Sequence, residues 1–172
     1  MPIFELREVI NFPSLTALPE QMSGLKSLEE LDAGYNPLKV FPSQILTLTN
    51  LRSLQLWENQ LKHLPLGIGK LQKLETLNLA GNYLEELPTE LEYLQALQFL
   101  DLRFNELTEL PIAVTELKNL RELNMRGNHL ESLPESIKQL SKLEKLHLQE
   151  NDFPEQVQKT IKSQLPKCEI IF

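Results

Sequence analysis

Apolar and polar residues follow one another along this chain in a pattern that repeats every 23 residues. If position 1 of the repeat is set at Leu28, five complete units follow, and the later ones begin at Leu51, Leu74, Leu97 and Leu120. Positions 1, 4, 6, 11, 14, 18 and 21 are apolar in every unit, which makes thirty-five apolar positions without an exception. The pattern predicts a tandem repeat whose seven apolar positions face one continuous interior.

Two further residue types keep the same period. Asparagine occupies position 9, at residues 36, 59, 82, 105, 128 and 151. Proline occupies position 15, at residues 42, 65, 88, 111 and 134, and also residue 19 of the partial unit before them. An asparagine side chain offers an acceptor and two donors, so we expect it to satisfy backbone groups of its own turn and of the next unit, as a ladder. Proline fixes φ and donates no hydrogen bond, so the segment after it should be extended or a one-turn 3₁₀ helix.

The residues before the asparagine predict a strand. Leu77-Asn78-Leu79 alternates apolar, polar and apolar residues, which is the period of a half-buried strand. Strands of neighbouring units then lie side by side in parallel, ~4.8 Å apart. The eight or nine residues of each return segment are few for a full α-helix, so the opposite side should be mostly 3₁₀ or irregular. The fold class is therefore α/β.

The pattern predicts a single repeat domain over residues 1–172, closed by a cap at each end because an open stack would expose leucines. Residues 1–27 are assigned to an N-terminal cap and partial repeat, with Phe4, Ile10 and Phe12 over the first interface and a strand at 9–12. Residues 28–142 hold the five full repeats, and residues 143–172 a partial repeat and C-terminal cap. There, Phe153, Val157, Ile161 and Leu165 recur at steps of four, which predicts an α-helix followed by a strand at 168–172.

The segment Leu87-Pro88-Thr89-Glu90-Leu91-Glu92-Tyr93-Leu94 carries the motif L-P-x-x-[IL]-x-x-L. Residues 15–153 thereby resemble 23-residue leucine-rich repeats, as found in Ras-pathway scaffolds, plant Ras-group-related proteins and stand-alone bacterial repeat proteins. The ending 165–172 is similar to the C-terminal cap of the bacterial proteins. The resemblance implies a horseshoe-shaped solenoid with the sheet on its concave face, where partners bind. Bacterial effectors of related type carry a catalytic ubiquitin-ligase domain after their repeats. Because that activity belongs to the added domain, the resemblance of the repeats does not imply it here.

Charge and composition narrow the classes of partner. The formal net charge is −7, and an acidic surface repels phosphate, so nucleic acid and anionic membranes are poor partners. No apolar run approaches the ~20 residues of a membrane helix. The N-terminus lacks the basic and apolar regions of a signal peptide, which fits a cytoplasmic protein and equally fits an exported one whose signal has been removed.

No group of residues has the pattern of a catalytic or metal site. Cys168, the single cysteine, has no base near it in sequence and is interpreted as a small apolar residue of the terminal strand. His63, His129 and His147 occupy three different repeat positions, although metal ligands must converge on one point. We therefore expect no enzyme activity, no cofactor and no metal.

Positions 3, 5, 7 and 8 point away from the predicted core beside each strand, and there the chain places large side chains. Aromatic residues and arginines are enriched in interface hot spots, and the alternative is that the rings lie flat on the sheet or pack against neighbouring units. The predicted partner-binding residues are Tyr35, Trp57, Phe99, Asp101, Arg103, Phe104 and Arg126.

These features predict a non-enzymatic module, expected to be monomeric, that binds a protein or peptide partner of unknown identity on its concave face. A structural or self-associating protein is the alternative, because the terminal strand Ile170-Ile171-Phe172 would leave a sheet edge open for pairing.

Overall fold

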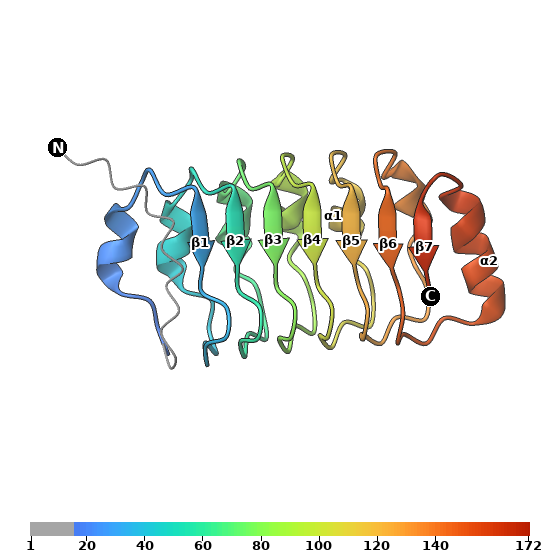
Figure 1. Ribbon diagram of the computed structural model, residues 1–172, viewed down its shortest axis with the longest axis horizontal. Helices are drawn as coiled ribbons and strands as arrows, with labels where there is room; N and C mark the ends of the chain where they lie inside the picture. The colour runs from blue at the N-terminus through green and yellow to red at the C-terminus, as the bar shows by residue number, and fades with distance from the viewer. Residues whose placement is uncertain (1–15) are drawn as a thin grey trace.

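A computed structural model describes residues 16–172, in which seven three-residue strands form one open parallel sheet (Figure 1). The strands lie in the sheet in their sequence order, so each unit is the neighbour of the units before and after it. They are β1 (Glu30–Asp32), β2 (Ser53–Gln55), β3 (Thr76–Asn78), β4 (Phe99–Asp101), β5 (Glu122–Asn124), β6 (Lys145–His147) and β7 (Glu169–Ile171). The predicted α/β solenoid with a parallel sheet is confirmed.

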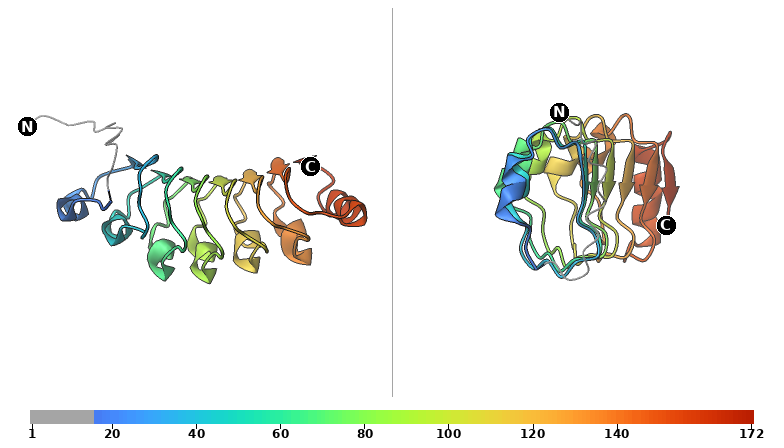
Figure 2. Two further views of the ribbon diagram at one scale, coloured as in Figure 1. Left: turned by 90° about the horizontal axis from the view of Figure 1, so that it is seen from below. Right: turned by 60° about the vertical axis from the view of Figure 1, so that its left-hand side comes forward.

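The register of the sheet follows the repeat. Leu31 pairs with Leu54, Leu54 with Leu77, and the same step continues through Leu100 and Leu123. Because successive side chains of a strand point to opposite faces, each central leucine enters the core and its two flanking residues face outward. The outward residues of all the strands therefore share one surface, which Figure 2 shows on the side away from the helices.

The other side of the solenoid consists of single helical turns that begin after the repeated proline. Five are 3₁₀ helices: η1 (Glu20–Gly24), η2 (Ser43–Thr47), η3 (Leu66–Lys70), η4 (Thr89–Tyr93) and η5 (Glu135–Gln139). The proline carbonyl accepts the first hydrogen bond, as from Ile68 N to Pro65 O at 3.0 Å. The fourth full unit forms a short α-helix instead, α1 (Ile112–Thr115). The prediction of a mostly 3₁₀ convex side is confirmed, and the arc in Figure 2 is concave on the sheet side.

The predicted interior positions form the core. Of the thirty-five, all are buried except Leu28 and Leu133, which are partly buried and pack against the others. Leucine dominates this core, and its side chains stack from one unit to the next as one cluster. At roughly 1.5–3 kcal/mol for each fully buried large apolar side chain, the burial of these side chains is the main favourable contribution to folding.

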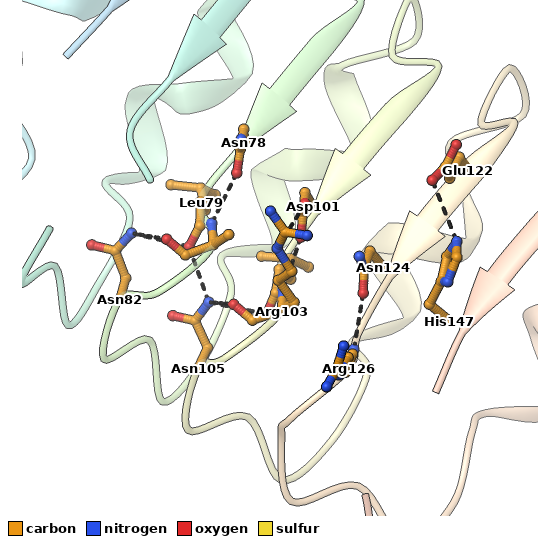
Figure 3. A network of polar contacts seen from close by, with 12 residues as sticks. Asn78, Leu79, Asn82, Asp101, Arg103, Asn105, Glu122, Asn124, Arg126 and His147 are labelled. Atoms are coloured by element: carbon orange, nitrogen blue, oxygen red, sulfur yellow. Dashed lines mark hydrogen bonds and ion pairs between the residues drawn. The ribbon is translucent and has the colours of Figure 1, made fainter. Parts of the chain in front are cut away.

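Asparagine at position 9 forms the expected ladder of hydrogen bonds. Asn82 is 3% exposed, and its Nδ2 donates to Leu79 O in its own turn at 3.0 Å and to Leu56 O at 2.9 Å. Its Oδ1 accepts from Leu61 N at 3.0 Å. Asn105 repeats this arrangement one unit later (Figure 3). The amides reach back to the preceding unit rather than forward to the next, so the predicted direction of the ladder is corrected.

The C-terminal end is closed by a helix and a strand, as predicted. Phe153 is buried, helix α2 (Glu155–Gln164) places Ile161 in the core, and β7 pairs with β6. Phe153 and Phe172 meet edge to face with their ring centroids 6.0 Å apart. At the other end, Leu18 and Met22 are buried next to the first unit. The predicted contacts of Phe4, Ile10 and Phe12 and the strand at 9–12 lie outside the described residues.

Within residues 16–172, no helix combines the length and the apolar content that crossing a bilayer would require.

The asparagine ladder should contribute strongly to stability. We expect Asn82→Ala and Asn105→Ala each to lower the free energy of unfolding by ~1–3 kcal/mol, because each leaves several buried backbone groups without a partner. Chemical denaturation measures the loss. Asn119→Ala is the matched control, since its Nδ2 bonds Gln95 O at an exposed site; an equal loss in the control would contradict the special role of position 9.

The C-terminal cap should be required for a soluble, cooperative fold. Deleting residues 153–172 removes Phe153, Ile161 and Leu165 from the end of the core and exposes the last unit, because each repeat contacts only its neighbours. We expect aggregation or a broad thermal transition, measured by light scattering and circular dichroism. A soluble truncation that melts in one sharp step would show that the stack tolerates an open end.

Candidate partner-binding surface

The concave face carries an exposed aromatic residue in the middle of its sheet. Phe99 is the first residue of β4 and is 43% exposed. It borders a shallow depression of about 260 Å³, which is also lined by the outward residues Gln55, Thr76, Asn78, Asp101, Glu122 and Asn124. The sheet therefore offers an apolar ring surrounded by amides and carboxylates on a backbone that is held by strand pairing on both sides.

Asp101 has a structural function in addition to its place on this surface. Its Oδ1 accepts a hydrogen bond from Arg103 N at 3.1 Å, and its Oδ2 lies 3.4 Å from Arg103 Nε (Figure 3). Burial raises the pKa of the Asp101 carboxyl, while the bond from Arg103 N and the Arg103 guanidinium act in the opposite direction. The carboxylate thus closes the turn after β4 and orients Arg103.

The same turn recurs at position 5 of other units. Asp32 accepts from Gly34 N at 2.9 Å, Asn78 from Ala80 N at 3.1 Å, and Asn124 from Arg126 N at 3.1 Å. The sequence pattern did not reveal this function, although aspartate and asparagine commonly form turns in which their side chain bonds the backbone N–H two residues on. The residue at position 5 therefore stabilises the turn in four units and also lies on the candidate partner-binding surface.

Tyr35 and Trp57 form an aromatic pair across the first two units. Their ring centroids are 6.1 Å apart and the planes are tilted by 35°. The indole of Trp57 lies directly over Gly34, because a Cβ added to that glycine would be 2.3 Å from Trp57 Nε1. Trp57 is half-buried, so the alternative that the rings pack against neighbouring units is partly correct for this residue. Tyr35, in contrast, is 65% exposed.

Phe104 and Arg126 form a second pair. The Arg126 guanidinium lies 5.3 Å from the centroid of the Phe104 ring, and its Nη2 is 2.5 Å from Glu150 Oε1. The Phe104 ring covers Gly127 much as Trp57 covers Gly34. Stacking on an aromatic ring and pairing with a carboxylate hold an arginine in one orientation, which leaves less side-chain entropy to lose when a partner binds.

The predicted residues form two groups rather than one patch. Tyr35 and Trp57 belong to the first two units, whereas Phe99, Asp101, Arg103, Phe104 and Arg126 belong to the fourth and fifth. The third unit separates them with two small residues, Ala80, which is buried, and Gly81. At ~4.8 Å per strand, the second and fourth units are ~10 Å apart. The two groups can therefore be bridged by one partner.

Tyr35 and Phe104 stand in the turn after the strand, where the backbone is left-handed. Position 8 has a positive φ in every unit of the repeat, at Tyr35, Glu58, Gly81, Phe104, Gly127 and Glu150. The sequence pattern did not reveal this conformation, because glycine, its usual signal, occupies position 8 in only two of the six units. These two rings therefore lie at the rim of the concave face, next to the edge of the solenoid.

The histidines do not come together. His129 Nε2 lies 2.9 Å from Glu106 Oε2, His147 Nε2 lies 3.4 Å from Glu122 Oε1, and His63 pairs with Glu86. No group of histidine, cysteine, aspartate or glutamate in residues 16–172 is arranged to hold a metal ion. Burial and the neighbouring Glu169 raise the pKa of the Cys168 thiol to about 11, so it stays protonated at neutral pH.

The geometry so far defines a class, the repeat solenoids that present one extended concave sheet. Comparison with known proteins identifies the family. A family model described as leucine rich repeat matches residues 49–107, and a model of two leucine rich repeat copies matches residues 95–138 and 118–159. The chain belongs to the leucine-rich-repeat family. Members of this family generally serve as protein interaction modules and are typically non-enzymatic scaffolds. Among curated proteins, none matches the chain.

Solved structures agree with this assignment. A leucine-rich-repeat protein of Leptospira interrogans is 34% identical with a TM-score of 0.80, over 92% of this chain and 46% of that one. The ectodomain of the Arabidopsis thaliana membrane receptor kinase GASSHO1/SCHENGEN3, solved with CASPARIAN STRIP INTEGRITY FACTOR 2, is 32% identical with a TM-score of 0.72, over 81% and 17%. A plant peptide hormone receptor, RGFR1, solved with RGF2, is 27% identical with a TM-score of 0.71, over 81% and 23%. The chain spans less than half the length of each.

The packing of Trp57 on Gly34 gives a direct test of this surface. We expect Gly34→Ala to fold but to displace the indole, since the new Cβ would overlap a mobile side chain rather than backbone. The fluorescence of Trp57, the only tryptophan, should shift to the red and become easier to quench. Gly24→Ala is the control, because a Cβ there meets no atom within 4 Å. Unchanged emission in Gly34→Ala would show that the ring lies elsewhere.

Proposed function

We propose that this chain is a non-enzymatic interaction module that binds a protein or peptide on its concave face. Trp57, Phe99, Arg103 and Arg126 supply the principal contacts, Tyr35 and Phe104 supply the rim, and Asp101 orients Arg103. The observation that carries the proposal is Phe99, an exposed phenylalanine in the centre of a sheet whose neighbours on the same face are polar. A large apolar side chain exposed there contributes nothing to the core, and its burial by a partner is favourable.

The charges on this face support a polypeptide partner. Arg103 pairs with Asp101 and Arg126 with Glu150, while Glu122 lies 3.4 Å from His147, so groups of both signs lie close together. A polyanion such as nucleic acid would meet repulsion at the carboxylates, and the net charge of −7 adds to it. A folded protein or peptide can present complementary groups to both signs.

Rigidity also supports binding at this site. Phe99 stands on a paired strand, and Arg103 and Arg126 stand in turns where the side chains of Asp101 and Asn124 accept backbone hydrogen bonds. Little backbone order remains to be gained when a partner docks, so less of the interaction energy is lost to ordering. The plant receptor RGFR1, which shares this fold, was solved with RGF2 bound, and this supports a peptide as one form of partner.

Self-association is the second candidate. β7 is the last strand of the sheet and pairs with β6 on one side, while no strand of residues 16–172 pairs with its other side. An unpaired strand edge is a template for another chain. Size-exclusion chromatography with light scattering separates the two candidates: a concentration-dependent dimer would favour self-association, and a monomer would favour a different partner.

Loss of the concave contacts should weaken binding strongly without unfolding the protein. The partner is first captured from the native environment and identified. We then expect Trp57→Ala and Arg103→Glu each to reduce the affinity for this partner at least tenfold, as for interface hot spots. Trp57→Ala also loses its contact with Tyr35, about 0.5–1.5 kcal/mol of stability. Lys70→Glu makes the same charge reversal as Arg103→Glu at an exposed site on η3 and should leave binding unchanged. Full binding by both concave variants would overturn the proposal.

A further inference from the structure

A groove is lined by residues of the turns that follow the strands. In Figure 1 these turns lie beyond the arrowheads, along one edge of the solenoid. The groove has a volume of about 760 Å³ and is lined by positions 8 to 10 of successive units, from Tyr35 in the first to His129 in the fifth. This edge groove is distinct from the depression around Phe99, with which it shares no lining residue. Its volume is about three times that of the depression around Phe99.

The length of the edge groove suits an extended chain. The groove spans five units, and the four steps of ~4.8 Å between them separate its two ends by ~19 Å. At ~3.3 Å per residue, this distance accommodates about six residues of extended polypeptide. A small organic cation would occupy only part of such a groove, so its shape favours a peptide segment.

The centre of the edge groove holds a carboxylate between aromatic residues. Glu58 lies over Gly81 of the next unit, with its Oε1 2.7 Å from where a Cβ of that glycine would be. Tyr35 of the preceding unit and Tyr83 of the following one line the groove on either side, and they are 65% and 51% exposed. The absence of a side chain at Gly81 leaves the carboxylate accessible from the groove.

The charge of the groove is negative. Besides the two tyrosines, its ionisable lining groups are Glu58, Glu106 and His129, and its lining holds no lysine or arginine. Glu106 is paired with His129 at 2.9 Å. No hydrogen bond or ion pair joins the Glu58 carboxylate to any group of residues 16–172, whereas nearby Glu85 pairs with Lys62 at 3.7 Å. The groove thus contains one unpaired carboxylate flanked by two tyrosine rings.

We propose that the edge groove binds an extended peptide segment carrying a lysine or arginine side chain, whose cation sits on Glu58 between Tyr35 and Tyr83. A carboxylate supplies the charge-assisted hydrogen bond, and the faces of tyrosine rings attract cations. This is a second contact surface, beyond the concave site, and a partner that turns over the rim at Tyr35 and Phe104 can reach both. The net charge of −7 favours basic partners in general.

The test uses a capped alanine hexapeptide with two lysines, titrated into the ¹⁵N-labelled chain at low salt. We expect saturable binding, with chemical-shift changes at the amides of Gly81, Tyr83 and Gly127. Glu58→Gln keeps the shape of the side chain and should weaken binding about fivefold, the upper range for an exposed ion pair. Tyr83→Ala should also weaken it. Glu109→Gln, which makes the same charge change at an exposed site outside the groove, should have little effect.

Three outcomes would overturn the proposal. One is equal binding of a matched hexapeptide with glutamate in place of lysine. Another is equal weakening by Glu58→Gln and Glu109→Gln, which would indicate net charge alone. The third is a set of shifts confined to strands β2 to β5. The first two outcomes leave the concave proposal untouched, since capture of its partner is measured separately with Trp57→Ala and Arg103→Glu. The third would place the hexapeptide on the concave sheet instead of in the edge groove.

Discussion

The structure depends on one interaction, the set of hydrogen bonds that each buried asparagine makes with the backbone around it. Where the chain leaves the strand and turns inward, several peptide groups lose contact with water, and each unpaired one would cost ~1–3 kcal/mol. The amide of Asn82 satisfies groups in its own turn and in the preceding unit. Since Asn105 does the same for the next pair of units, this one side chain per unit fixes both the turn and the spacing of the stack. The leucine core and the strand register then follow from the same spacing.

The sequence predicts most of this fold because each signal is local and repeated. Leucine at the seven interior positions, proline before each helical turn, and the apolar stripe from Phe153 to Leu165 each correspond to an observed element. The direction of the asparagine ladder could not be predicted. An amide can reach either neighbouring unit, and the repeat spacing does not say which turn lies within hydrogen-bonding distance. The α-helical turn of α1, where the other units are 3₁₀, has no evident signal in its sequence.

The candidate surface was predicted less completely, because it depends on contacts between side chains of different units. The outward positions could be counted, but Trp57 packs on Gly34 and Phe104 on Gly127, which are contacts from one unit to the next. The double function of Asp101, which closes a turn and holds Arg103, depends on distances of about 3 Å that spacing alone does not give. The edge groove was missed because its lining comes from positions 8 to 10 of five successive units, and a hollow that spans several units cannot be read from the pattern within one unit.

Position 8 has a left-handed backbone conformation in every unit, yet only two units place glycine there. Glycine adopts this conformation freely, as at Gly81 and Gly127, whereas a residue with a side chain is disfavoured there by about 1 kcal/mol. Tyr35, Glu58, Phe104 and Glu150 nevertheless occupy it. The backbone would be more stable with glycine at these four places, so their side chains work against the stability of their own turns. The edge of this solenoid is therefore a place where the chain gives up stability to display particular chemical groups to its surroundings.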